Sequence, residues 1–132
     1  MNVTDNFMSQ NLMPQDLDLS FLYDIADGST EFIVESIDMF LHHTPELLET
    51  ITNGIANDDW TIVASASHKL KPNLGFFGMT QSQANIQEVE LMAKAGAPDP
   101  ALLRSKFEDV KAVVMDNIAS LVLIKAEKEA EL

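Results

Sequence analysis

The sequence of 132 residues contains no cysteine, which excludes disulfides and thiolate metal sites and permits a reducing compartment. No run approaches the roughly 18 apolar residues of a membrane span, and the N-terminus lacks the basic and apolar regions of a signal peptide. Basic residues are scarce, eight against twenty-one acidic ones, for a net charge of −13. We therefore predict a cytoplasmic protein that binds neither nucleic acid nor membrane.

The negative charge also limits which proteins can dock on this chain. It keeps the chain soluble, and it repels an acidic partner unless the contact surface is locally neutral or basic. Hydrophobic residues make up 46% of the sequence, as in ordinary globular proteins. At this length they suffice for one core, so we predict a single domain.

Apolar residues recur at helical spacing through most of the chain, and no run alternates as a half-buried β-strand does. Gly28 and Gly96 are typical helix stops, and Thr44 before Pro45 is typical of a helix start. These signals predict six helices, at about 17–26, 29–42 and 44–56, from about 60 past His68, and at about 80–96 and 100–124.

Polar residues at the predicted helix starts indicate how each helix is capped. Ser29 or Thr30 would cap the second helix, and Asn57 or Asp58 the fourth. For the fifth helix, Thr80 followed three residues later by glutamine is a capping-box pattern.

The last four predicted helices are amphipathic and joined by short connections, which is typical of an antiparallel bundle. The two earlier helices would cap one end. The predicted fold class is therefore all-α, an up-and-down antiparallel four-helix bundle with one or two additional N-terminal capping helices. We expect residues 1–16 to be a flexible arm, 17–125 the helical domain and 126–132 a frayed tail.

The fourth predicted helix places His68 away from its apolar stripe. At about 100 degrees per residue, His68 lies roughly 120 degrees from the centre of the stripe and should face solvent. Its neighbours on that surface are small, so another protein's active site could reach the imidazole. The predicted docking residues are Ala64, Ser65, Pro72 and Gly75, and the stripe consists of Trp60, Val63, Ser67, Leu70 and Leu74.

An exposed neutral imidazole is a competent nitrogen nucleophile at cellular pH. A phosphoryl group on His68 would add almost two negative charges, and Lys71 lies three residues on, close enough to neutralise part of them. From geometry alone, however, a single exposed histidine is more often an ordinary polar surface residue. On the fifth predicted helix, Gln83, Gln87 and Glu90 are either hydrogen-bonding neighbours of His68 or, as the commoner interpretation, a solvated face.

The stretch SHKLKPNLGFFG, from Ser67 to Gly78, resembles the signature H-x-L-K-G-S-S of histidine-containing phosphotransfer (Hpt) domains. Similar pattern elements precede it at 17–20, 40–41, 44–48 and 59–60 and follow it at 86–91, so the resemblance spans about residues 17–121. It implies that His68 exchanges a phosphoryl group with response-regulator receiver domains or a sensor histidine kinase, and that Lys71 supports the added charge. It also implies no cofactor on this chain, because Mg²⁺ belongs to the receiver.

Pro72 departs from the family pattern, which has glycine there, and Asn73 and Leu74 stand where the family has two serines. Proline has no N–H for the carbonyl four residues back, which is that of His68. We therefore expect a kink or a loosened turn just beyond His68, with consequences for which receivers fit.

No other candidate site competes with His68. His42 and His43 are adjacent, so they do not share a helix face, and no Glu-x-x-His pair exists for a di-iron site. We predict no metal site. The sequence predicts a monomeric phosphocarrier of a phosphorelay with no enzyme turnover of its own. The alternative is a helical module that binds a receiver or kinase without transfer, which Pro72 favours and Lys71 opposes.

Overall fold

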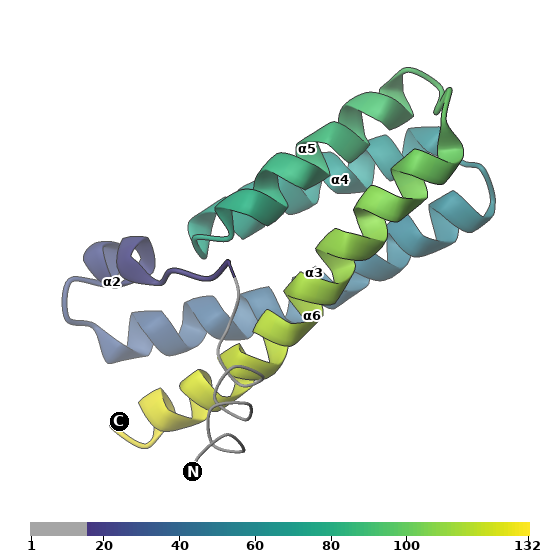
Figure 1. Cartoon of the computed structure of the whole chain (residues 1–132). Coiled ribbons are helices and arrows are strands. Elements are labelled where there is room, and N and C mark those ends of the chain that lie inside the picture. The colour runs from purple at the N-terminus through teal and green to yellow at the C-terminus, as the bar shows by residue number, and fades with distance from the viewer. Residues whose placement is uncertain (1–15) are drawn as a thin grey trace, which may run out of the picture.

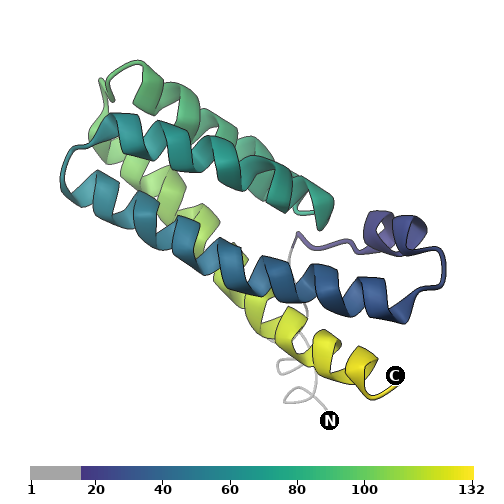
Figure 2. The same cartoon turned by 180° about the vertical axis from the view of Figure 1, so that it is seen from behind.

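The computed structural model describes residues 16–132, which form an all-helical bundle (Figure 1). The helices are α2 (Ser20–Ala26), α3 (Thr30–Ala56), α4 (Trp60–Phe76), α5 (Thr80–Lys94) and α6 (Pro100–Glu129). Both α3 and α5 pack against α4 and α6, which gives the up-and-down arrangement of four helices. The short α2 packs on α3 at one end (Figure 2). The predicted fold class is confirmed, with one capping helix among the described residues.

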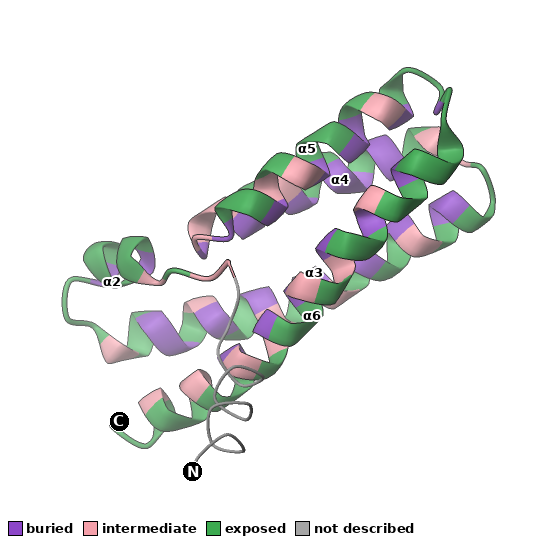
Figure 3. Cartoon of the chain, viewed as in Figure 1, coloured by how far each residue is buried: buried purple, intermediate pink, exposed green. Residues whose placement is uncertain are grey.

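Each of the four long helices buries one mostly apolar stripe against the others (Figure 3). The largest fully buried side chains come from all of them, among them Ile37, Leu48, Leu70, Ile86 and Phe107. Burying a side chain of this size contributes about 1.5–3 kcal/mol, so the core is the main source of stability. No helix within residues 16–132 is both long and apolar enough to cross a membrane.

The prediction that a new helix begins at Thr44 and Pro45 is wrong. Helix α3 runs through both residues, with Pro45 inside it. Its buried positions keep helical spacing across the proline, at residues 33, 37, 40, 44, 48, 51 and 55. One unbroken helix can bury this whole stripe, and that burial outweighs the cost of about 3 kcal/mol for an interior proline.

Two predicted caps are also corrected. Asp59, not Asn57 or Asp58, caps α4, where its carboxylate accepts a hydrogen bond from the Ile62 amide. The capping box at Thr80 does not form, because Met79 is the cap residue and has no side-chain cap bond. Instead the carboxylate of Asp16 accepts hydrogen bonds from the Gln81 and Ser82 amides. Residues 1–15, the rest of the expected arm, lie outside the described residues.

Helix α6 continues to Glu129, beyond its expected end at Ile124, so residues 126–129 of the expected tail are helical. Lys125 explains part of this extension. Its ammonium pairs with Glu129 one turn on and with Asp38 of α3, each at 3.4 Å. The hydrogen bond to Glu129 is the main cause of a raised pKa of Lys125. These contacts hold the last turns of α6 against α3.

The turn between α4 and α5 fixes how the two helices that carry the candidate site meet. Gly78 adopts φ +70°, a conformation that favours glycine, and a Cβ there would overlap the backbone of Asp18. The amide of Asp18 donates to the carbonyl of Phe77 at 3.2 Å. The segment before α2 therefore crosses this turn in close contact and holds the end of the α4–α5 hairpin.

Candidate functional site

Helix α4 presents His68 to solvent, with 67% of the side chain exposed. The helix buries Val63, Ser67, Leu70 and Leu74 against the bundle, so His68 is left on the outer side. Trp60, which was assigned to the same stripe, is only partly buried because it is the first residue of the helix. The imidazole is therefore accessible to another macromolecule.

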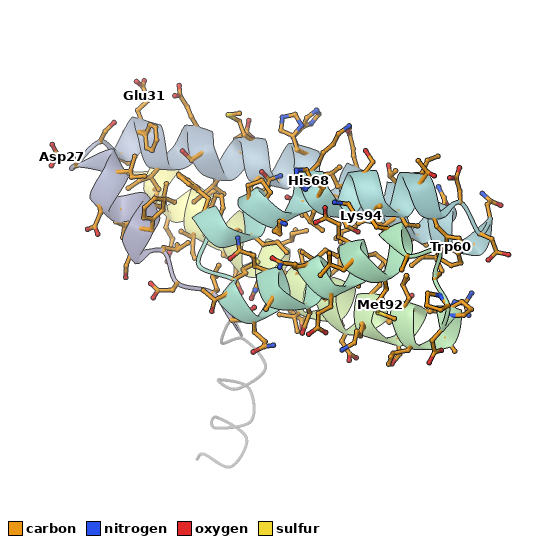
Figure 4. All side chains as sticks on the ribbon, turned by 90° about the horizontal axis from the view of Figure 1, so that it is seen from above. Asp27, Glu31, Trp60, His68, Met92 and Lys94 are labelled. Atoms are coloured by element: carbon orange, nitrogen blue, oxygen red, sulfur yellow. The ribbon has the colours of Figure 1, made fainter. Side chains whose placement is uncertain are left out.

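Glu90 of α5 forms a hydrogen bond with the His68 ring. Its carboxylate oxygen Oε2 lies 2.9 Å from His68 Nδ1, although the two residues are 22 positions apart in the sequence. The same carboxylate accepts from Lys71 Nζ at 3.1 Å and from Lys94 Nζ at 2.9 Å. Glu90 is 2% exposed, so a buried carboxylate joins the histidine to two lysines. Figure 4 shows His68 and Lys94 on this surface.

The charge state of Glu90 determines which nitrogen of His68 carries the proton. Burial alone would raise the pKa of Glu90, but hydrogen bonds from Lys94, Lys71 and His68 outweigh burial and lower this pKa to about 2. An ionised carboxylate only accepts hydrogen bonds, so Nδ1 must be the donor. In the neutral ring, Nε2 then carries the free lone pair on the side away from Glu90.

Basic residues gather around His68 in an otherwise acidic protein. Lys71 and Lys94 contact Glu90, and Lys69 lines the same hollow as His68, so three of the eight basic residues lie here. Two of these lysines pair with the Glu90 carboxylate, and Lys69 makes no ion pair within residues 16–132. The net charge of −13 would repel an acidic partner unless the contact surface were locally neutral or basic. The surface around His68 is locally basic, so it can receive an anionic group.

Of the three polar residues singled out on α5, only Glu90 contacts His68. Gln83 instead donates from Nε2 to the Lys71 carbonyl at 3.2 Å, passing over Gly75, where a Cβ would collide with it. Gln87 is exposed and makes no side-chain hydrogen bond within residues 16–132. Gln87 therefore belongs to a solvated helix face, whereas Glu90 is a hydrogen-bonding neighbour of His68.

Sequence reasoning missed Lys94 and underrated Glu90. The available signal was their spacing of four residues on one helix, which places opposite charges side by side. Glu90 also adjoins the buried positions Ile86, Val89 and Ala93 of α5. A carboxylate at the edge of an apolar stripe is costly to bury unless a cation or a hydrogen-bond donor pairs with it. The sequence could not indicate which residues on α4 supply that pairing.

The four predicted docking residues lie in two different hollows on either side of His68. Ala64 and Ser65 line a large hollow between α4 and α5, of about 1040 Å³. Pro72 and Gly75 line a smaller one, of about 380 Å³. Ala64 was expected at the surface but is 8% exposed, because its small side chain lies at the floor of the large hollow.

Pro72 does not end α4, which remains helical to Phe76. The ring still removes the N–H that would pair with the His68 carbonyl, so the turn beyond the histidine has one helix bond fewer. The hydrogen bond from Gln83 to the neighbouring Lys71 carbonyl ties this turn to α5. Packing against α5 therefore keeps the turn helical.

His42 and His43 are exposed on α3, with His42 at 4.0 Å from Glu46. Within residues 16–132, no three acidic or histidine side chains are grouped as metal ligands would be.

Comparison with known proteins agrees with this geometry. The family model described as Hpt domain matches residues 35–121, which is more than half of the chain and includes His68, Lys71, Glu90 and Lys94. No curated protein and no solved structure matches the chain. An exposed histidine on the second long helix of an antiparallel bundle, with the family match across that bundle, leads to one conclusion: the chain belongs to the Hpt domain family, whose members carry phosphoryl groups on histidine in phosphorelays.

Proposed function

We propose that this chain is a phosphocarrier that accepts a phosphoryl group on Nε2 of His68 and passes it to or from the aspartate of a receiver domain. The observation that carries the proposal is the bond between His68 Nδ1 and the buried Glu90 carboxylate. It orients an exposed ring and leaves Nε2 as the nucleophile. The surrounding lysines favour the approach of an anionic phosphoryl group.

The transfer requires one bond to form and one to break. The Nε2 lone pair attacks phosphorus of the aspartyl phosphate, and the P–O bond to the receiver carboxylate breaks as that carboxylate leaves. The Nδ1 proton stays hydrogen-bonded to Glu90, so the phosphorylated ring carries a positive charge beside a carboxylate. Lys71 lies 3.1 Å from Glu90 and supplies positive charge near the phosphoryl oxygens. The same steps in reverse return the group to an aspartate.

An apolar patch beside His68 provides a contact surface for the receiver. We define it as Phe21, Phe32, Met39 and Phe76, which line the two smaller hollows on the Pro72 side of the histidine. Phe21 and Met39 are 53% and 60% exposed, and exposed apolar residues in a cluster mark interaction surfaces. The ring of Phe21 meets that of Phe76 edge-on at 5.5 Å, which joins α2 to the end of α4.

The direct test is incubation of the chain with a receiver domain phosphorylated with labelled phosphate. We expect label on this chain that is lost in acid and stable in base, as for a phosphoramidate bond. Edman or mass-spectrometric mapping should place it on His68. Absence of label with a panel of active receivers and kinases would contradict phosphotransfer and favour a binding module.

Lys71→Ala should slow transfer to His68 by about tenfold, which corresponds to about 1.4 kcal/mol of lost transition-state stabilisation. It should cost about 1 kcal/mol or less in folding, because Glu90 keeps its contacts with His68 and Lys94. Rates of label transfer and of phosphohistidine hydrolysis measure the effect. Lys106→Ala is the matched control, since Lys106 pairs with another α5 carboxylate, Glu88. Equal rates for Lys71→Ala and Lys106→Ala would remove Lys71 from the mechanism.

Pro72→Gly should change receiver preference while leaving acceptance at His68 intact. The substitution restores an N–H donor for the His68 carbonyl. It also removes the proline ring from the wall of the hollow that Pro72 lines with Phe21 and Phe76, so that hollow becomes larger. We expect transfer rates across a receiver panel to change in rank order by severalfold, with little loss of thermal stability. Indistinguishable rank orders would show that Pro72 has no docking role.

A further inference from the structure

The hollow of about 1040 Å³ between α4 and α5 starts at His68 and extends away from the apolar patch. We call it the α4–α5 groove and define it by Trp60, Thr61, Ser65, His68, Ala93 and Lys94, with Asp58 at its far end. On α4 it runs from Trp60 to His68, eight residue steps or about 12 Å of helix. Figure 4 shows this order along the surface, with Lys94 between His68 and Trp60.

The two ends of the groove carry opposite charges. Lys69 is at the histidine end, next to His68 in the sequence, and Lys94 lies between His68 and Trp60. At the far end is Asp58, in the loop before α4. Within residues 16–132 the side chains of Lys69 and Asp58 make no hydrogen bond or ion pair. The neighbouring Asp59 is already occupied as the cap of α4. The groove thus offers an unpaired cation near the phosphoacceptor and an unpaired anion beyond the other end of the roughly 12 Å stretch from Trp60 to His68.

We propose that the α4–α5 groove binds a segment of the receiver that is docked at His68, and that this segment carries an anionic group at the Lys69 end and a cationic side chain at Asp58. This inference rests on the proposed phosphotransfer function. The receiver is the occupant because the groove opens directly onto His68, so whatever reaches the imidazole lies at its mouth.

The dimensions and walls of the groove fit such a segment. A length of about 12 Å accommodates about four residues of extended chain. Trp60 and Ala93 supply apolar walls, and the hydroxyls of Thr61 and Ser65 supply hydrogen-bonding groups along α4. The opposed charges give the segment a direction. A segment of reversed polarity would face repulsion at both ends, so the groove selects among receivers.

The single tryptophan of the chain reports directly on occupancy, because Trp60 lines the groove. We expect a tryptophan-free receiver domain to reduce the quenching of Trp60 fluorescence by acrylamide as it binds. Unchanged quenching at saturating receiver would overturn the proposal. A decrease that depends on the concentration of this chain alone would also overturn it, since a second copy would then fill the groove.

Asp58→Asn tests the charge at the far end without disturbing the backbone, because asparagine tolerates the φ of +54° found there. We expect the KM for the phosphorylated receiver to rise three- to fivefold, with kcat unchanged. Thr61→Arg should raise this KM more, because it fills the groove and repels the cationic end. Asp27→Asn is the matched control, an exposed aspartate with φ +48° at the opposite end of the molecule from Trp60 (Figure 4).

Phosphorylation by phosphoramidate, a small donor that needs no docking, separates the two proposals. All of these variants should label His68 from phosphoramidate as fast as the natural sequence does. If the natural sequence takes no label from phosphoramidate or from any receiver, phosphotransfer fails and the groove proposal fails with it. If the natural sequence is labelled by receivers and Asp58→Asn and Thr61→Arg match the Asp27→Asn control in KM, only the groove proposal is overturned.

Discussion

We expect His68→Gln to abolish phosphoryl acceptance and to leave the helical bundle intact. This is the largest effect that we expect, because glutamine has no ring nitrogen to attack phosphorus. The fold should survive because 67% of the His68 side chain is exposed and its one side-chain hydrogen bond within residues 16–132 is to Glu90, which keeps both lysines. Label transfer from a phosphorylated receiver measures acceptance, and circular dichroism with thermal unfolding measures the fold.

His42→Gln and His43→Gln are the controls for that experiment. Both histidines are exposed on α3 and neither contacts Glu90 within the described part of the chain, so both variants should accept label from phosphoramidate at the full rate. With receivers the control is His42→Gln, because His43 lines one of the two hollows of the apolar patch. Label retained at another histidine in His68→Gln would refute the assignment of His68.

Glu90→Gln is expected to have the second largest effect, a loss of at least about tenfold in the rate of acceptance. The ionised carboxylate holds Nδ1 as a donor and stabilises the positive charge of the phosphorylated ring, whereas an amide can accept only weakly and can present its own N–H to the ring. It also leaves Lys71 and Lys94 without their shared anion. Nitrogen NMR of His68 should show a weakened preference for the Nδ1-protonated tautomer, which a purely structural role of Glu90 would not produce.

The same variant has a distinct stability profile with pH. The folded pKa of Glu90 is about 2, below its ordinary value of 4.5, so its ionisation stabilises the fold above pH 4.5. That contribution, up to about 3 kcal/mol at about 1.4 kcal/mol per pKa unit, is lost as the pH falls through 4.5 toward 2. The gap in unfolding free energy between the natural sequence and Glu90→Gln should therefore be widest at pH 7 and shrink toward pH 2. Urea unfolding at pH 7, 4 and 2.5 measures it.

Glu88→Gln is the matched control on α5. Glu88 is 53% exposed and pairs with Lys106 alone among the described residues, so its loss should change acceptance little and stability only slightly. A gap between the natural sequence and Glu90→Gln that stays constant with pH would contradict an ionised, hydrogen-bonded Glu90 in the fold. Equal acceptance rates for Glu90→Gln and Glu88→Gln would remove Glu90 from the mechanism.

Local signals in the sequence were enough for most of the secondary structure, and they failed where a long-range contact competed with them. Asp99 followed by Pro100 is a local start signal of the same kind as Thr44 followed by Pro45, and Asp99 does cap α6, because both residues act on their own helix end. Thr44 and Pro45 form an equally good local start signal, yet α3 passes through them because one continuous stripe is buried against α4 and α6. Asp16 takes over the cap of α5 from 65 residues away, which no local pattern contains.

The sequence by itself determined the all-helical class, the acidic charge and the presence of His68 on the outer side of its helix, since each depends on composition or on the period of one helix. The tertiary structure alone decided that Glu90 reaches His68 across 22 positions, and that Lys94 joins Lys71 on its carboxylate. The physical reason is that the register of α4 against α5 follows from core packing and from the α4–α5 turn at Gly78. A helical period specifies which face a residue occupies, and only the packed bundle specifies which residue lies opposite it.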